Sequence, residues 1–257
     1  KLAECYRRIN YTQRAIAAYN NAIRYNQADS MTHLRLAQQQ MKAGSYKEAA
    51  KNFQAALDSL PGNRLAANGL KAARMAPEWK EQGSQYTVKR ENLFNSRRAD
   101  YSPMLAGDNN DQLYFTSTRT EVKGDELSGI TGTKNGDIFV STKDENGKWT
   151  KPQDIDTELN SEFDEGACSF SPDGKTMYLT QCTTDPQYPR YATICTSTRS
   201  DASWGKSTTL ELTKDTLSSY AHPAVSPDGE WLYFTSDMPG GMGGLDIWRV
   251  RLTAAGV

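Results

Sequence analysis

The chain has 257 residues, which is long enough for two folded bodies, and 30 basic against 31 acidic side chains give it a net charge of -1. A protein that follows nucleic-acid phosphates needs a basic face, so this balance gives no electrostatic reason to expect nucleic acid as a partner. No apolar run reaches the roughly 18 residues that a membrane span requires, and no signal-peptide core opens the chain. Because Lys1 lies inside an expected helix, we expect a processed or truncated protein.

Residues 1–76 have the pattern of helix pairs that repeat. Alanines and aromatic residues recur with a period of 34 residues, as they do where the helices of a stack touch. The superimposed pairs are Ala15 and Ala49, Tyr19 and Phe53, and Asn10 and Gly44. At the last pair, a turn, asparagine and glycine both tolerate positive φ. The period resembles the tetratricopeptide repeat (TPR), whose helix pairs bury their apolar faces by stacking.

The TPR resemblance implies a concave face, lined by the first helix of each repeat, that binds protein partners. We expect a groove for a peptide or helix that carries carboxylates, and a solvated polar face without a ligand is the alternative. The candidate protein-binding residues are Glu4, Arg7, Arg8, Gln38, Met41 and Lys42.

One further helix and a linker are expected before the second body. Residues 64–75 are amphipathic and would cap the stack, although Gly69 costs about 1 kcal/mol relative to alanine inside a helix. Pro77 interrupts the helical pattern, so we expect a linker over 77–85.

Residues 86–257 predict β-sheet blades, because one short strand pattern returns three times. A second repeated strand follows each copy, and Trp149 and Trp204 introduce a fourth strand. We therefore expect a multidomain fold of class α plus all-β, in which a partial β-propeller of about three blades follows the helices. The second strands are Leu113–Ser117, Met177–Gln181 and Leu232–Ser236, and the third strands are 137–140, 193–196 and 246–249.

Two of the second strands follow an identical turn, Ser171-Pro-Asp-Gly174 and Ser226-Pro-Asp-Gly229. Proline presets the first corner, aspartate bonds the local backbone and glycine takes the corner with positive φ. In the first blade a looser loop, Ala106 to Asp111, replaces this turn. Because propellers have about 4–8 blades, we expect further blades outside this sequence. The stretch 86–96 resembles the fourth-strand stretch 149–161, as a strand that completes the last blade would.

The strings Phe170 to Tyr178 and Val225 to Tyr233 resemble the PD40 subgroup of WD40-like repeats, which TolB-type propellers contain. Joined to TPR helices, they resemble the Bacteroidetes proteins of the OmpA family, which include a component of the type IX secretion system. The resemblance implies a periplasmic protein associated with the outer membrane. It would hold protein partners through the TPR groove and the propeller rim, and peptidoglycan through a C-terminal domain outside this sequence. The expected function is a non-enzymatic scaffold without a cofactor.

The sequence offers little catalytic chemistry. Of the two histidines, His33 falls at a packing position, and His222 precedes Pro223 in an inner strand where we align it with Ser102 and Gly166. A structural role is favoured for both histidines. The chain has no nucleophile elbow, P-loop or dinucleotide-binding motif.

Acidic stretches and cysteines suggest no firm site either. Asp108 to Asp111 and Asp125-Glu126 have the composition of a calcium loop but lack its spacing, so no metal is expected. Cys182 and Cys195 flank a hairpin loop and are candidates for a disulfide in an oxidising compartment. The alternative is that all four cysteines are small buried apolar residues.

The loops over 119–135 and 183–190 are long and variable, and such loops on one rim are where a propeller usually carries recognition. Two rival functions stay open. A propeller that binds a glycan or small molecule needs aromatic and carboxylate side chains that converge on the central channel. A hydrolase needs two carboxylates or a catalytic triad, which the sequence does not assemble.

Overall fold

The computed structural model describes residues 1–122, 127, 134–155, 158–182, 192–200 and 203–253, which belong to two compact units, Lys1–Lys89 and Arg90–Val257. The expected recognition loop over 183–190 lies outside the described residues, as do most of the loop over 119–135 and the acidic pair Asp125 and Glu126. None of the helices in the described part of the chain is long and apolar enough to cross a membrane.

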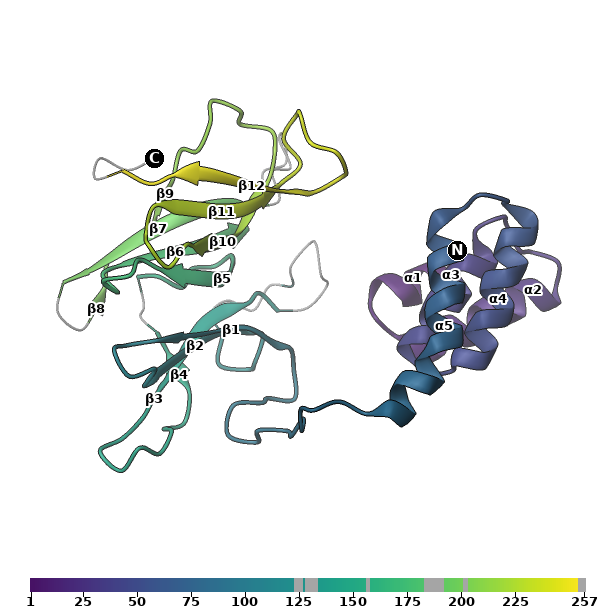
Figure 1. The fold of residues 1–257 in the computed structure, drawn as a ribbon, viewed down its shortest axis with the longest axis horizontal. Coiled ribbons are helices and arrows are strands. Elements are labelled where there is room, and N and C mark those ends of the chain that lie inside the picture. Colours follow the sequence, from purple (N-terminus) through teal and green to yellow (C-terminus); the bar gives the residue numbers. More distant parts are fainter. Residues whose placement is uncertain (123–126, 128–133, 156–157, 183–191, 201–202, 254–257) are drawn as a thin grey trace. The chain divides into compact units, whose positions relative to one another are not determined.

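The first unit consists of helices that each pack against the next along the chain (Figure 1). They are α1 (Leu2–Arg8), α2 (Thr12–Arg24), α3 (Thr32–Lys42), α4 (Tyr46–Ser59) and α5 (Arg64–Gln82). Positions 34 residues apart in these helices are alike in burial, since Ala15 and Ala49 are both fully enclosed. They are also alike in backbone geometry, because Asn10 and Gly44 have φ of +57° and +74°.

Helix α5 is longer than expected, and the prediction of a linker that starts at residue 77 is wrong. The helix continues through Pro77 to Gln82 and ends at Gly83, whose φ is +67°. A proline has no N–H to donate to the preceding turn, so one main-chain hydrogen bond of the helix is lost at Pro77. The remaining main-chain hydrogen bonds of this long helix keep it intact. After the proline, Nε2 of Gln82 donates a hydrogen bond to Oε1 of Glu78 at 2.9 Å.

Gly69 has a packing role in α5. A Cβ atom at this position would lie 2.4 Å from Cε1 and Cζ of Phe53, a buried side chain of α4. Glycine therefore lets the two helices approach each other, and this contact offsets its low helix propensity.

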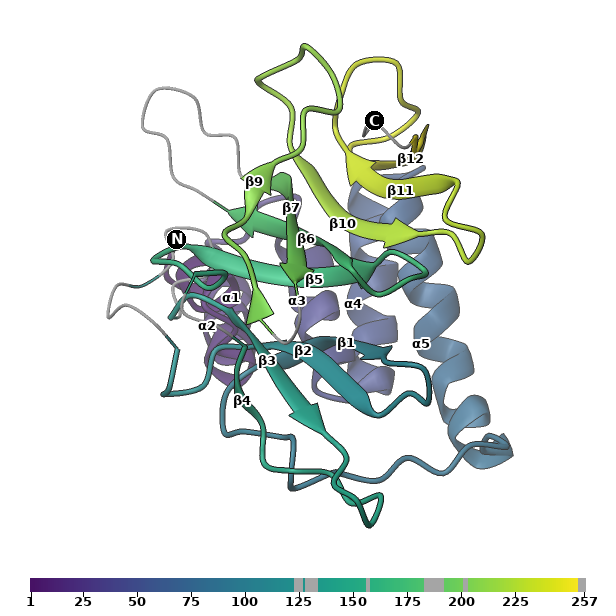
Figure 2. The ribbon, with the colours of Figure 1, turned by 90° about the vertical axis from the view of Figure 1, so that its left-hand side faces the viewer.

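In its described residues the second unit contains three antiparallel sheets, each a simple up-and-down meander. We number these sheets blades 1, 2 and 3 in chain order. Blade 2 lies between blades 1 and 3 (Figures 1 and 2). Stacked meanders of this kind form a partial β-propeller, which confirms the predicted fold class of this part of the chain. Blade 1 has β1 (Asp100–Ala106), β2 (Gln112–Ser117), β3 (Asp137–Thr142) and β4 (Gln153–Asp154); blade 2 has β5 (Asp164–Phe170), β6 (Thr176–Cys182), β7 (Thr193–Ser200), β8 (Ser203–Trp204) and β9 (Thr208–Thr209); blade 3 has β10 (Tyr220–Val225), β11 (Trp231–Ser236) and β12 (Asp246–Arg251).

Pairing with the third strand begins at the tryptophans, as expected, but it is interrupted. Trp204 lies in β8, which pairs with β7, and Trp149 forms a β-bridge with Lys143. The short strands β4 and β9 resume this pairing at Gln153 and Thr208. The stretch 86–96 forms no strand. The end of this stretch nevertheless makes the same kind of hydrogen bond as the segment before β5. The N–H of Ser96 donates to the carboxylate of Asp100 at 2.6 Å, and the N–H of Ser161 donates to the carboxylate of Glu165 at 2.9 Å.

The first strand of each blade carries a bulge, and β5 and β10 use theirs to bind the preceding blade. The N–H of Ala167 donates to Oγ1 of Thr116 at 3.2 Å, and the N–H of His222 donates to Oγ1 of Thr180 at 2.9 Å. Thr116 and Thr180 hold the same position in the repeated second strand. We call this contact the bulge–threonine bond. The bulge residues with positive φ are Ser102 (+52°), Ala167 (+45°) and His222 (+56°).

The alignment of His222 with Gly166 is therefore wrong by one residue. The register shift between Gly166 and Ser169 puts Ala167, not Gly166, in the left-handed conformation that His222 adopts in blade 3. A bulge inserts one residue opposite the partner strand, and periodicity alone does not show where.

One face of blade 3 lacks a neighbouring sheet in the described part of the chain. Ile138, Ile194 and Ile247 are equivalent, since each lies opposite the threonine of its second strand. Ile138 and Ile194 are 0% exposed, whereas Ile247 is 78% exposed. Blades 1 and 2 thus bury this face against the next blade, and blade 3 leaves it open.

Candidate functional site

The predicted groove residues of the helical unit lie on α1 and α3, and a charged network joins these helices. The carboxylate of Glu4 accepts hydrogen bonds from Nε and Nη2 of Arg7 at 3.0 and 2.5 Å, and from the hydroxyl of Tyr19 on α2 at 2.8 Å. Nε of Arg35 on α3 lies 3.8 Å from the same carboxylate. We call the surface formed by Glu4, Arg7, Arg8, Arg35, Gln38, Met41 and Lys42 the α1–α3 face.

The protonation states of this network are fixed at neutral pH. Hydrogen bonds from Arg7 and Tyr19 lower the pKa of Glu4 to about 2, although partial burial opposes its ionisation. Burial, together with the hydrogen bond to Glu4, raises the pKa of Tyr19 to about 12. Glu4 is therefore an anion and Tyr19 a neutral donor, and their bond ties α1 to α2.

The α1–α3 face keeps a positive charge after these pairings. Arg7 is held by Glu4, and Nη1 of Arg35 lies 3.7 Å from Oδ2 of Asp29. Nε of Arg8 also lies 3.5 Å from Oε1 of Glu4, but the Arg8 side chain is 75% accessible to solvent, and Lys42 is exposed too. Four cationic side chains (Arg7, Arg8, Arg35 and Lys42) thus face two carboxylates (Glu4 and Asp29). The half-buried Gln38 and Met41 complete the face.

Sequence reasoning missed Arg35, which links the predicted residues of α1 to those of α3. Its spacing was a usable signal, because Arg35, Gln38 and Lys42 follow each other at i, i+3 and i+7 on one side of a helix. The link at the other end of the face, from Nζ of Lys42 to Oδ1 of Asn10 at 3.4 Å, depends on the turn after α1 and has no such signal.

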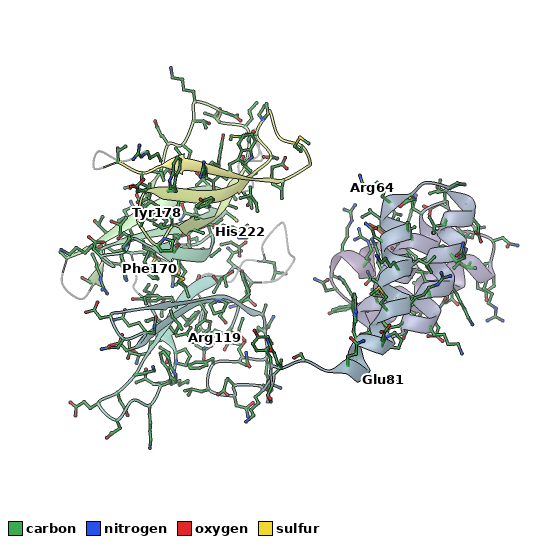
Figure 3. The ribbon with its side chains drawn as sticks, viewed as in Figure 1. Arg64, Glu81, Arg119, Phe170, Tyr178 and His222 are labelled. Carbon is green, nitrogen blue, oxygen red and sulfur yellow. The ribbon has the colours of Figure 1, made fainter. Side chains whose placement is uncertain are left out.

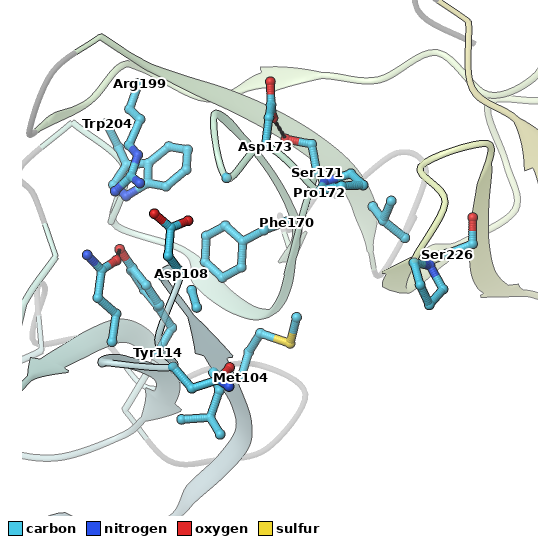
Figure 4. A pocket seen from close by; sticks show the side chains of 18 residues that line it. Met104, Asp108, Tyr114, Phe170, Ser171, Pro172, Asp173, Arg199, Trp204 and Ser226 are labelled. Atoms are coloured by element: carbon cyan, nitrogen blue, oxygen red, sulfur yellow. Dashed lines mark hydrogen bonds between the residues drawn. The ribbon is translucent and has the colours of Figure 1, made fainter.

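A cavity of about 490 Å³ lies in the sheet-forming unit, between the β1–β2 loop of blade 1 and the β5–β6 turn of blade 2 (Figure 4). We call it the rim cavity. Three aromatic rings form its base, with centroids 4.7 Å apart for Tyr114 and Phe170 and 5.7 Å apart for Phe170 and Trp204. The guanidinium of Arg199 lies over the Trp204 ring at 5.3 Å, and Asp108 points toward both from the β1–β2 loop (Figure 4).

No model of a known protein family matches the chain, and no curated protein matches it. The chain is similar to TolB from Acinetobacter baumannii, with 21% identity, coverage of 63% of this chain and 32% of that one, and a TM-score of 0.39. A puromycin-hydrolysing peptidase from Mycobacterium tuberculosis is 18% identical, over 60% of this chain and 21% of its own, with a TM-score of 0.39. A TolB-type protein from Agrobacterium tumefaciens is 19% identical, over 62% and 60%, with a TM-score of 0.31.

The chain therefore spans about a third of the length of the Acinetobacter baumannii TolB. Identities and TM-scores at this level transfer no function, so the site must be judged on its own side chains.

Buried charged groups in the blades are structural. Arg119, labelled in Figure 3, belongs to blade 1. It donates to Oδ1 of Asp100 at 3.0 Å and lies over the rings of Phe115 and Phe139. Burial raises the pKa of Glu165, against hydrogen bonds from Ser161 and Gln181 that favour its charged form. The carboxylates of Asp100 and Glu165 thus each accept several hydrogen bonds from neighbouring protein groups.

The two histidines have structural contacts. Nδ1 of His33 lies 2.8 Å from Oδ1 of Asn52, whose amide donates to Oε1 of Gln40 at 3.0 Å, so His33 belongs to a polar contact between α3 and α4. His222 is an exposed side chain on the β10 bulge, and its backbone N–H forms the bulge–threonine bond.

Cys182 and Cys195, the candidates for a disulfide, are both free thiols. In the β6–β7 register Cys195 lies opposite Leu179, so Cys182, three residues further along β6, points to the other face of the sheet. Burial, with the charges of Asp164 and Glu165, raises the pKa of Cys182 to about 11, so this thiol stays protonated at neutral pH. The alternative prediction, burial of all four cysteines, is wrong, because Cys5 is exposed.

The acidic stretch Asp108 to Asp111 forms the β1–β2 loop. Asp111 folds back against Gly107, where a Cβ atom would lie 2.0 Å from its Oδ1, and the φ of Gly107 is +83°. Across the described ranges, no three histidine, cysteine or acidic side chains gather as metal ligands.

Proposed function

We propose that this chain is part of a scaffold that binds protein partners and catalyses no reaction itself. The observation that carries the proposal is the positive charge left on the α1–α3 face after Arg7 and Arg35 are paired. Exposed Arg8 and Lys42 beside the half-buried Met41 suit an amphipathic segment that carries carboxylates.

The kind of scaffold follows from the sequence resemblances. The 34-residue helix period supports a TPR-type unit, and the two Ser-Pro-Asp-Gly turns support a PD40, TolB-type propeller. The proposed protein is periplasmic, associated with the outer membrane and of the OmpA family, similar to PorE of the type IX secretion system. Its attachment to peptidoglycan would use a C-terminal domain outside this sequence.

Capture of partners from a bacterial envelope extract tests this function. The bait is the full chain, compared with the charge reversal Arg8→Glu/Lys42→Glu and with the control Arg24→Glu/Lys51→Glu, which makes the same charge change on exposed positions of α2 and α4. We expect wild type and control to recover identified secretion-system or cell-wall proteins, and the face variant to recover several-fold less. Recovery of no such protein, or equal recovery by all three baits, contradicts the proposal.

The absence of catalysis is part of the proposal and has its own test. A panel of peptidase, esterase and glycosidase substrates is expected to show no turnover above buffer. Turnover that persists through purification would replace the scaffold by an enzyme.

The rim cavity favours a second function, the binding of a small ligand by the propeller. The aromatic residues Tyr114, Phe170 and Trp204 and the carboxylate of Asp108 line this cavity, which lies between the loops of the blades. Its volume of about 490 Å³ falls in the range of ligand pockets. Isothermal titration with a glycan and with a peptide tests whether the propeller binds a small ligand.

A further inference from the structure

The rim cavity exists because blade 1 departs from the repeat. Between blades 2 and 3, Pro172 of one Ser-Pro-Asp-Gly turn lies against Gly229 of the next, so that a Cβ on Gly229 would be 3.0 Å from Cγ of Pro172. The equivalent Gly174 has no such neighbour, and a Cβ there would meet only Nη2 of Arg199, at 3.7 Å. The β1–β2 loop has no proline to fill the space.

The same departure supplies the polar side chains of the cavity. The loop of blade 1 runs from Ala106 to Gln112, one residue longer than the turn over 171–176, and it brings Asp108 and Asn110 to the cavity wall. Space and functional groups therefore arise from a single change in the repeat.

Two opposite charges face each other across the rim cavity without pairing. Asp108 points toward Arg199 (Figure 4), yet neither side chain forms an ion pair within 4.0 Å in the part of the chain that the structure describes. Arg199 is held in place by stacking on Trp204. The other nearby carboxylate, Asp173, is occupied, because it accepts from Oγ of Ser171 at 2.5 Å and from the N–H of Lys175 at 3.1 Å.

This arrangement defines the chemistry of the ligand. A guanidinium that lies over an indole presents paired N–H donors that match a carboxylate. The carboxylate of Asp108 can accept from an ammonium group, and the rings of Phe170 and Tyr114, which also line the cavity, suit an apolar side chain. A neutral sugar would use the rings but neither charge.

We propose that the rim cavity binds a zwitterionic ligand of the size of a short peptide, with its carboxylate on Arg199 and its ammonium on Asp108. This inference rests on the second candidate function, ligand binding by the propeller, and is independent of the scaffold proposal.

Isothermal titration of the full chain with the tripeptide Ala-Ala-Phe tests the proposal. We expect the peptide with free termini to bind, and both its N-acetylated and its C-amidated forms to bind at least about tenfold more weakly, because each loses a charge-assisted hydrogen bond. Arg199→Gln and Asp108→Asn should each weaken the free peptide to a similar extent. The control is Arg249→Gln, which removes an arginine stacked at 4.2 Å on Trp231, on the open face of blade 3, and should leave binding unchanged.

The outcomes distinguish the zwitterion proposal from the broader proposal that the propeller binds a small ligand. Chitotetraose serves as an uncharged glycan probe. Binding of the glycan without the tripeptide overturns the zwitterion proposal and leaves ligand binding standing, whereas binding of neither probe overturns both. Equal affinity of the tripeptide for wild type, Arg199→Gln and Asp108→Asn also overturns the proposal. Asp108 is exposed on a loop, so its variant keeps the test valid if Arg199→Gln fails to fold.

Discussion

The backbone N–H of His222 donates a hydrogen bond to Oγ1 of Thr180 at 2.9 Å, and this bond joins blade 3 to blade 2. Ala167 and Thr116 make the same contact between blades 2 and 1. The threonine of the repeated second strand therefore has a packing function, since it satisfies a backbone donor that the bulge turns out of its own sheet.

Loss of this acceptor should destabilise the propeller unit. Thr180→Val leaves the N–H of His222 without a partner, so we expect the free energy of unfolding to fall by about 1–2 kcal/mol, measured by urea denaturation with tryptophan fluorescence. Thr180→Ser keeps the hydroxyl and should stay near wild type. Thr235→Val is the matched control, because Thr235 holds the same repeat position and, among the described residues, its hydroxyl bonds Ala221 of its own blade at 3.2 Å and no other blade. Equal losses for Thr180→Val and Thr235→Val would contradict the repeated role.

Ile194 and Ile247 hold equivalent positions in blades 2 and 3, but they should contribute differently to the free energy of unfolding. Ile194→Ala removes a fully buried side chain between blades 2 and 3 and should cost about 2–5 kcal/mol, whereas Ile247→Ala acts on a side chain that is 78% exposed and should cost less than about 0.5 kcal/mol. Denaturation of both variants under the same conditions checks the difference. A large loss for Ile247→Ala would mean that another part of the protein covers this face.

Gly69→Ala should destabilise the helical unit although alanine is the better helix former. Propensity alone predicts a gain of about 1 kcal/mol, but the added Cβ would lie 2.4 Å from the Phe53 ring and force α4 and α5 apart. Thermal melting followed by circular dichroism at 222 nm measures the sign. Gly69→Ala combined with Phe53→Leu should recover part of the loss, and a stabilised single variant would refute the close contact.

The helical unit should also lose stability in acid. Because the pKa of Glu4 is about 2 in the folded chain against an ordinary 4.5, its charge contributes stability above pH 4.5, and this contribution disappears as the pH falls toward 2. Circular dichroism melts across this window should show the loss in wild type. Glu4→Gln should be less stable at neutral pH and flatter over the window, while Glu81→Gln, at an exposed position of α5, should follow wild type. An unchanged pH profile in Glu4→Gln would show that this carboxylate does not stabilise the unit.

The repeats could be predicted from sequence because each follows a local rule. The alignment of Asn10 with Gly44 and the Ser-Pro-Asp-Gly turns both express a requirement for positive φ, and the structure shows it at Asn10, Gly174 and Gly229. The failures are of another kind. The place of the bulge at Ala167 and the passage of α5 through Pro77 depend on hydrogen bonds to neighbouring strands and turns, which a one-dimensional pattern does not contain.

The candidate sites were less predictable than the fold, for a physical reason. Glu4, Arg7 and Arg8 were identified by position in a repeat, but their pairing with Tyr19 and Arg35 follows from how three helices pack. In the rim cavity, Asp108 and Arg199 come from different blades. Only the irregular loop after Ala106 marked the place in the sequence.

The most direct test of the central claim is the affinity of the full chain for an amphipathic, glutamate-rich helical peptide, measured by fluorescence anisotropy at low and high salt. We expect binding that weakens as salt screens the α1–α3 face, and a loss of at least about tenfold in Arg8→Glu/Lys42→Glu but not in Arg24→Glu/Lys51→Glu. Binding that is independent of salt and equal in all three proteins would contradict it.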